Sequence, residues 1–116
     1  MTAAPRGFER YLAIWNGVVG LDELDALVTS SYVGHIGSRT RTLAELKEDI
    51  VEYRARAPGV LFHVEHQFGA GEFVATRVAA RVVDPREQTI RGINISRWDG
   101  ELLAEEWAVW EQLDSD

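Results

Sequence analysis

The sequence predicts an α+β domain in which three N-terminal helices pack on a curved antiparallel sheet of four strands and one short additional strand. Apolar residues recur with helical spacing through the first half of the chain, and after Gly59 the period changes to two, as in half-buried strands. The length of 116 residues suits one domain, with its core at about residues 8–113.

The three helices are predicted from their apolar stripes and their ends. The first is expected to end at Gly20, and the second covers about residues 21–28. The third begins at Thr42, whose spacing from Glu45 fits a capping box, and ends at Ala57-Pro58-Gly59. The stripes are Phe8, Tyr11, Leu12, Trp15, Val18 and Val19, then Leu21, Leu24, Leu27 and Val28, then Leu43, Leu46, Ile50 and Tyr53.

The strands are predicted from alternation and from turn residues. Residues 32–38 contain two glycines and are expected to form a turn or a very short strand. Four longer strands follow at about residues 60–68, 72–83, 88–98 and 101–113, rich in Val, Ile, Phe and Trp. Asp99-Gly100 is a strong hairpin signal, so these strands are expected to pair in order as a meander.

The composition excludes several classes of function. A formal net charge of −7 disfavours nucleic acid as a partner, because such binding depends on many Lys and Arg side chains. The absence of cysteine excludes disulfides, thiolate nucleophiles and cysteine-bound metals. No apolar run could span a bilayer and the N-terminus lacks a signal-like stretch, so we expect a cytoplasmic protein with no membrane partner.

Alternation along the second and third long strands gives the sheet two unlike faces. One face mixes arginines with isoleucines, which suits a homodimer interface. The other is small and apolar apart from Asn94 and Trp98, as in a pocket beneath helices. We therefore expect a homodimer through the arginine-bearing face, which carries Arg77, Arg81, Arg91, Ile93, Ile95 and Arg97.

Four stretches, in this order, carry a resemblance to a known family. They are Tyr11-Leu12-Ala13-Ile14-Trp15-Asn16, then Tyr32-Val33-Gly34-His35, then Ala57-Pro58 with Gly71-Glu72-Phe73-Val74-Ala75, and finally Gly92-Ile93-Asn94-Ile95-Ser96-Arg97-Trp98-Asp99-Gly100 with Glu105-Glu106-Trp107. The last is the most specific, because it is similar to a Gly-x-Asp-x-x-Arg-x-x-Asp/Asn-Gly hairpin followed by Glu-x-Trp. The chain thus resembles the SnoaL-like polyketide cyclases of the nuclear transport factor 2-like superfamily.

The resemblance implies a cone-shaped α+β barrel around an apolar pocket, usually in a homodimer, with a small hydrophobic molecule as ligand and no cofactor. Its members include aldol cyclases of polyketide esters, and relatives of the same fold include isomerases, epoxide hydrolases, dehydratases and proteins without known activity. The fold therefore does not fix the function. One departure matters: Asn94 stands where the cyclases carry an acid/base aspartate, and an amide does not exchange a proton near neutral pH.

The candidate catalytic residues are His35, Asn94 and Glu105. Aldol closure or isomerisation needs a base beside a carbonyl and a donor to the enolate. His35 is a candidate base because imidazole titrates near neutral pH, and Asn94 is a candidate donor. Glu105 and Glu106 point to opposite faces of a strand, so either is a candidate pocket carboxylate. The structural alternatives are a turn role for His35 and an arginine partnership for the glutamate.

Aromatic and basic residues supply candidate ligand contacts. We expect ligand binding by Trp15, Tyr32, His63, Trp98 and Trp107, although large aromatics in a small domain mostly belong to the core. No metal site is expected from His63-Val64-Glu65-His66, because strand alternation turns His66 away from the other two. Arg39 and Arg41 could bind a ligand carboxylate or could simply be solvated.

Two hypotheses follow from the sequence. In the first, the chain is a cofactor-independent cyclase, isomerase or epoxide hydrolase-like enzyme acting on a hydrophobic carbonyl compound or epoxide. In the second, it is a non-catalytic ligand-binding or dimerisation module of the same fold, a reading motivated by Asn94.

Overall fold

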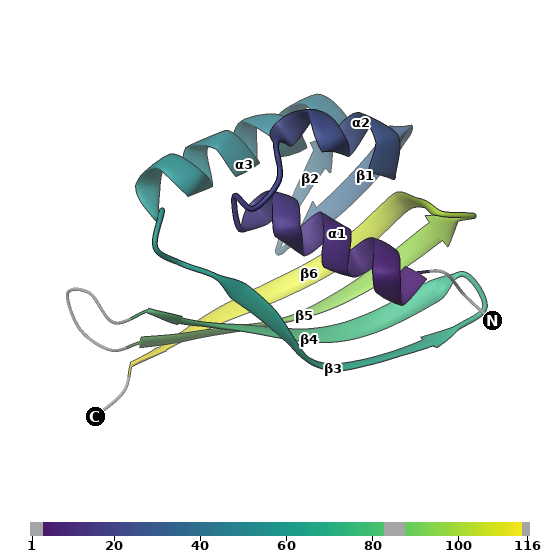
Figure 1. Cartoon of the computed structure of the whole chain (residues 1–116). Coiled ribbons are helices and arrows are strands. Elements are labelled where there is room, and N and C mark those ends of the chain that lie inside the picture. The colour runs from purple at the N-terminus through teal and green to yellow at the C-terminus, as the bar shows by residue number, and fades with distance from the viewer. Residues whose placement is uncertain (1–3, 83–87, 115–116) are drawn as a thin grey trace.

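The computed structural model describes residues 4–82 and 88–114 and confirms the α+β class. The helical elements are α1 (Ala4–Trp15), the short 3-10 helix η1 (Leu21–Glu23), α2 (Leu24–Leu27) and α3 (Leu43–Arg56). The strands are β1 (Val28–Ile36), β2 (Arg39–Thr42), β3 (Phe62–Ala70), β4 (Phe73–Val82), β5 (Gln88–Asp99) and β6 (Leu102–Asp114). The helices lie over one face of the sheet (Figure 1).

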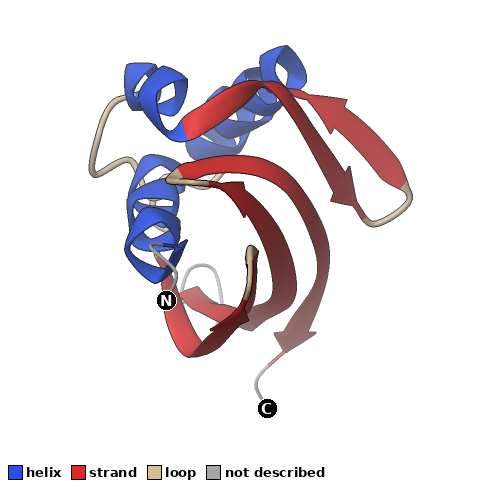
Figure 2. Cartoon of the chain, turned by 90° about the vertical axis from the view of Figure 1, so that its right-hand side faces the viewer, coloured by secondary structure: helices blue, strands red, loops and turns tan. Residues whose placement is uncertain are grey.

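One sheet of six strands runs in the order β2-β1-β6-β5-β4-β3. Neighbours pair antiparallel except β1 and β6, which are parallel. The meander from β3 to β6 follows the predicted order. Figure 2 shows that the sheet curls, so that its concave side faces the helices. The sheet therefore has one strand more than the four long strands and one short strand predicted. The expected short strand corresponds to β1, β2 is additional, and the β1–β6 pair is parallel where an antiparallel sheet was expected.

Strand β1 is longer than the sequence suggested. It runs for nine residues through Gly34, in a segment expected to be a turn or a very short strand. The glycine makes no turn here: a Cβ at Gly34 would collide with the phenol of Tyr32, which lies on the same face of the strand. Gly34 is thus needed for close packing rather than for backbone reversal.

Helix α1 ends earlier than its apolar stripe predicted. It stops at Trp15, and Gly17 adopts a φ of +75°, a left-handed conformation that favours glycine and ends the helix. Val18 is consequently 72% exposed instead of continuing the buried stripe.

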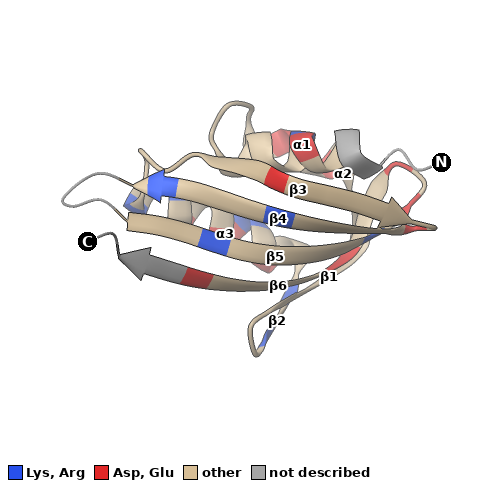
Figure 3. Cartoon of the chain, turned by 90° about the horizontal axis from the view of Figure 1, so that it is seen from below, with Lys and Arg blue, Asp and Glu red and all other residues tan. Residues whose placement is uncertain are grey.

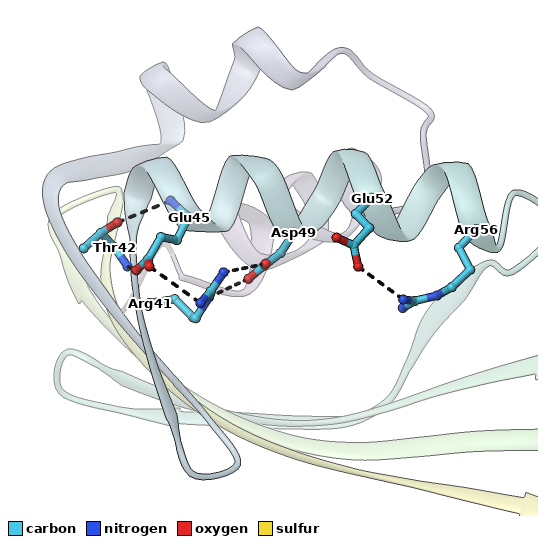
Figure 4. Close-up of polar contacts among 6 residues, drawn as sticks. All are labelled: Arg41, Thr42, Glu45, Asp49, Glu52 and Arg56. Atoms are coloured by element: carbon cyan, nitrogen blue, oxygen red, sulfur yellow. Dashed lines mark hydrogen bonds and ion pairs between the residues drawn. The ribbon is translucent and has the colours of Figure 1, made fainter.

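Helix α3 begins as predicted. Thr42 Oγ1 accepts a hydrogen bond from the Glu45 amide at 3.3 Å, and the Thr42 amide donates to Glu45 Oε1 at 2.9 Å (Figure 4). This reciprocal capping box satisfies two backbone N–H groups that the first turn would otherwise leave unpaired. The neighbouring Arg41 reaches Asp49 with two nitrogens, at 2.9 and 2.8 Å, and so ties β2 to the second turn of the helix.

The core lies between the helices and the concave side of the sheet. Its fully buried members include Phe8 and Ile14 of α1, Ile50 of α3 and Leu103 of β6. No helix in residues 4–82 and 88–114 is long and apolar enough to cross a membrane.

The convex side of the sheet carries paired charges. Seen from below, basic positions on β4 and β5 lie beside an acidic position on β3 (Figure 3). Glu65 accounts for this, because its carboxylate contacts both Arg77 and Arg91 at 3.1 Å. Arg97 contacts Glu105 at 3.2 Å, as predicted for cross-strand charge pairing.

Candidate functional site

A cavity of about 500 Å³ lies between the helices and the concave side of the sheet. Helices α1 and α3 form one wall, and strands β3 to β6 with β1 and β2 form the other. Its volume is in the range of small-molecule sites. The apolar lining consists of Phe8, Leu12, Trp15, Ile36, Leu46, Tyr53, Phe62, Val78, Ile90, Ala108 and Trp110.

A buried carboxylate lies in this lining. Glu106 is 2% exposed, and its two oxygens accept three hydrogen bonds from side chains. Tyr11 Oη donates to Oε2 at 2.5 Å, Tyr32 Oη donates to the same oxygen, and Asn94 Nδ2 donates to Oε1 at 2.7 Å. We call Glu106, Tyr11, Tyr32 and Asn94 the Glu106 cluster. Within residues 4–82 and 88–114, no arginine, lysine or histidine forms an ion pair with Glu106.

Local structure explains how the cluster assembles. Glu106 and Ala108 alternate onto the concave face of β6, and Asn94 faces the same way from β5, one diagonal step along the antiparallel pair. Tyr32 reaches the carboxylate across the parallel β1–β6 pair, over the space that Gly34 leaves. Tyr11 comes down from α1. Side chains from α1, β1 and β5 thus converge on one carboxylate of β6.

The two phenols of the cluster are held in the protonated form. Burial, followed by the nearby charge of Glu106, raises the pKa of Tyr11 and of Tyr32 well above the ordinary value of 10.0. Both side chains therefore remain O–H donors at any physiological pH. Asn94 Oδ1 is also buried and accepts no hydrogen bond in the structure, which leaves one acceptor of the cluster unused.

Four aromatic rings line the cavity in a continuous row, which we call the aromatic wall. Trp15 meets Tyr53 edge-on with ring centroids 5.8 Å apart, Tyr53 lies 5.8 Å from Phe62, and Phe62 lies 5.3 Å from Trp110. The wall borders the cavity, and its outer member, Trp110, is 42% exposed. Such a surface suits a flat apolar molecule.

The structure places His35 and Glu105 outside the cavity. Tyr32, Gly34 and Ile36 face the concave side of β1, so His35 faces the convex side, and Glu105 is turned away from the cavity because Glu106 faces it. There His35 Nε2 lies 2.8 Å from Glu105 Oε2. The hydrogen bond with His35 and those with Arg97 lower the pKa of Glu105.

Trp107 lies in this same convex cluster. Its ring stacks on the imidazole of His35, with centroids 5.3 Å apart and an interplanar angle of 11°. The structure thus brings His35, Glu105 and Trp107 together, but on the side of the sheet opposite the Glu106 cluster.

The other candidates divide between the cavity and the rest of the molecule. Asn94 and Trp15 line the cavity, and Tyr32 belongs to the Glu106 cluster. Trp98 is 2% exposed and packed against Gly7, with its indole N–H bonded to Ser96 Oγ at 2.8 Å. His63 is exposed on β3, and it is absent from the cavity lining.

Tyr11 is the member of the cluster that sequence reasoning assigned only to the core. A signal was present, because Tyr11 precedes Trp15 by four residues and so shares its helix face. Burial of a phenol in that stripe requires a hydrogen-bond acceptor, and a carboxylate is one.

Comparison with known proteins agrees with this architecture. No protein-family model matches the sequence, and no curated protein sequence matches it. Several solved structures do match the fold of the chain. A SnoaL-like polyketide cyclase from Agrobacterium tumefaciens superposes with a TM-score of 0.78 at 17% identity, and the match covers 96% of this chain and 93% of that protein. The chain has the SnoaL-like fold.

Two further structures show how widely this fold is used. IdmH from Streptomyces antibioticus, provisionally assigned as a polyketide cyclase, superposes with a TM-score of 0.80 at 18% identity and covers 94% of this chain and 92% of its own. A nuclear transport factor 2-like protein of unknown function from Cytophaga hutchinsonii superposes at 0.72 with 10% identity, covering 90% and 95%. The fold alone therefore does not determine the chemistry, which has to be argued from the residues that line the cavity.

Proposed function

We propose that the chain is a cofactor-independent enzyme of the SnoaL-like family that uses Glu106 to move a proton on a hydrophobic carbonyl compound of polyketide type. The observation that carries this is the Glu106 cluster: a buried carboxylate, without a cationic partner among the described residues, at an apolar cavity. General acid–base catalysis at carbon needs such a group, and exclusion of water strengthens its effect.

The proposed step is proton abstraction beside a carbonyl. Glu106 takes the proton, the electron pair of the broken C–H bond forms the enolate C=C bond, and the negative charge develops on the carbonyl oxygen. The phenol of Tyr11, which turns from Glu106 once that carboxylate is protonated, or the second amide hydrogen of Asn94 then donates to that oxygen. Return of the proton at another carbon gives isomerisation. In aldol closure the enolate carbon attacks a second carbonyl, and the alkoxide formed there takes the proton from Glu106. With an epoxide, Glu106 would take a proton from water, the water oxygen would bond to a ring carbon as the ring C–O bond breaks, and the ring oxygen would then take the proton from Glu106.

A model reaction tests this without knowledge of the natural substrate. 2-Tetralone is a flat ketone, and exchange of the protons beside its carbonyl in D₂O can be followed by NMR. We expect exchange above the buffer rate, and Glu106→Gln should reduce the catalysed rate by about 100-fold or more. Glu105→Gln is the matched control, because it changes the adjacent glutamate on the outer face. Equal losses in both variants, or no loss in either, would contradict the proposal.

The second candidate is a binding module without catalysis. It is favoured by the three hydrogen bonds that already occupy both oxygens of Glu106, because a substrate proton could reach the carboxylate only if one of these donors gave way. If 2-tetralone binds in calorimetry while its proton exchange stays at the buffer rate, this second function is supported.

We also propose a homodimer through the convex face of the sheet. Ile93, Ile95 and Val109 are 47%, 42% and 60% exposed there, next to the Trp107 ring. Apolar side chains rimmed by paired charges are typical of protein interfaces. Sedimentation should show a dimer at micromolar concentration that Ile93→Arg converts to a monomer, while Leu61→Arg, on an exposed residue ahead of β3, should not. A monomeric wild-type chain would overturn this proposal.

A further inference from the structure

Three arginines line the mouth of the cavity, and two of them are already paired. Arg41 is held by both oxygens of Asp49 and lies 3.6 Å from Glu45. Arg56 lies 3.3 Å from Glu52 (Figure 4). Each of these two guanidiniums therefore already contacts a carboxylate on α3.

Arg39 is different. It lines the cavity mouth, yet it forms no hydrogen bond or ion pair with any residue in the described parts of the chain. Its charge contributes to lowering the pKa of Glu45, although the two side chains form no ion pair. Although the whole chain carries −7, this point of the mouth presents a guanidinium that no side chain in the described residues contacts.

The backbone fixes the direction of this side chain. Arg39 is paired with Ile36 across the β1–β2 hairpin, and residues directly opposite in an antiparallel pair point to the same face. Ile36 lines the cavity, so Arg39 faces the same side. The hairpin turns through Gly37, whose φ is +62° and whose amide donates to the Ala108 carbonyl at 2.9 Å, so the turn is fastened to β6.

We propose that Arg39 recognises a carboxylate carried by the ligand of this cavity. The ligand class is then a flat apolar molecule with one anionic end: its rings lie along the aromatic wall, and its carboxylate meets the guanidinium at the mouth. The planar fork of arginine matches a carboxylate with two parallel hydrogen bonds, which an amide cannot reproduce. This inference rests on the proposed function only in taking the cavity as the binding site, and it does not depend on proton transfer by Glu106.

A matched pair of probes tests the inference. Anthraquinone-2-carboxylate and anthraquinone-2-carboxamide share three flat rings and differ in charge at one end. In calorimetric titrations the wild-type protein should bind the carboxylate about five- to tenfold more tightly, and this preference should shrink as salt is raised, because the site is exposed to solvent. Arg39→Gln should abolish the preference and leave the affinity for the carboxamide unchanged.

Arg56→Gln is the control, because it removes an arginine of the same mouth that is already paired with Glu52. It should retain the preference within about twofold. Arg39→Lys should keep part of it, since charge remains while the planar fork is lost. A wild type that binds both probes equally, or an Arg39→Gln variant that weakens both equally, would overturn the inference. Failure of both probes to bind would also overturn it, while exchange of 2-tetralone protons would still report separately on Glu106.

Discussion

Asn94 Nδ2 donates a hydrogen bond to Glu106 Oε1 over 2.7 Å, which places an acid directly beside the asparagine. At this position of the third long strand the resemblance implied an acid/base aspartate, and the sequence has an amide there instead. The neighbouring strand supplies a carboxylate. Asn94 thus contacts Glu106 at one oxygen, while two tyrosines contact the other.

The first prediction concerns the stability of the Glu106 cluster. Glu106→Leu leaves two phenols and an amide buried without their acceptor, and it should lower the free energy of unfolding by about 3 kcal/mol. Glu106→Gln should cost less than about 1 kcal/mol, because its amide oxygen still accepts from the tyrosines and a rotated Asn94 can offer its unused Oδ1 to the new NH₂ group. Urea unfolding measures both, and equal costs would contradict this account of the hydrogen bonds.

The second prediction restores the carboxylate at position 94. Asn94→Asp places two carboxyl groups within hydrogen-bond distance in a buried site, where both cannot be ionised at low cost. The introduced group should therefore have a pKa above its value in the unfolded chain. Its protonated form is retained in the folded state, so relative to wild type the variant should be least destabilised below about pH 4 and should lose stability as the pH rises.

The measurement for this variant is the urea midpoint at acidic and neutral pH, compared with wild type at each pH. We expect the difference between variant and wild type to grow by about 2 kcal/mol on going to neutral pH. A difference that does not change with pH would mean that the two carboxyl groups do not interact.

Much of the fold was predictable because local signals and the tertiary structure agree. The strands after Gly59 alternate clearly, Gly100 adopts the positive φ of +63° expected for its hairpin, and the Thr42–Glu45 capping box marks the start of α3. The length of strand β1 was not predictable, because two glycines close together in the sequence indicate a turn. Gly34 and Gly37 look alike in this respect, but they have different roles in the structure. Gly37 makes a turn with a φ of +62°, whereas Gly34 makes room for Tyr32.

The site was harder to predict than the fold. Alternation shows that Glu105 and Glu106 face opposite ways, but it does not tell which one faces inward. The β5–β6 pair shifts register between Arg97 and Trp98, and a shift of one residue exchanges the two faces. The sequence similarly shows a histidine beside glycines, but it does not show which face of the sheet His35 lies on. In the structure His35 lies on the convex side, where its Nε2 forms a hydrogen bond with Glu105.

The third prediction concerns alkaline unfolding. Burial and the charge of Glu106 raise the pKa of Tyr11 and Tyr32 above the ordinary 10.0. A group whose pKa is raised on folding contributes full stability below its unfolded pKa and loses it as the pH rises toward the folded value. Above about pH 10 the chain should thus lose about 1.4 kcal/mol per pH unit for each of these tyrosines.

Tyr11→Phe and Tyr32→Phe test this assignment. Each should lower stability near neutral pH by about 1 kcal/mol through a lost hydrogen bond, and each should also flatten the alkaline slope. Urea midpoints at a series of pH values measure both effects. If the slope above pH 10 is the same in the two variants as in wild type, the phenols do not titrate as the structure predicts.

The fourth prediction links a backbone position to ligand binding. Gly92 lies on the concave face of β5 beneath the Trp110 indole, and a Cβ there would lie 2.6 Å from ring carbon Cδ2. Gly92→Ala must therefore displace the outermost ring of the aromatic wall. Because one aromatic contact is worth about 1 kcal/mol, the affinity for anthraquinone-2-carboxamide should fall by about fivefold. Gly59→Ala is the matched control, because a Cβ at that glycine meets no atom within 4 Å.

A double-mutant cycle separates displacement of the ring from general loss of stability. If Gly92→Ala acts through Trp110, it should have no further effect on affinity in a Trp110→Ala background, where the ring it displaces is gone. Additive losses would mean that the added methyl group disturbs the sheet or the Glu106 cluster instead. Since Trp110 is already 42% exposed, its ring can swing toward solvent, so thermal unfolding of Gly92→Ala should change less than ligand affinity does. That outcome would identify Gly92 as the position that keeps the mouth of the cavity lined by a flat ring.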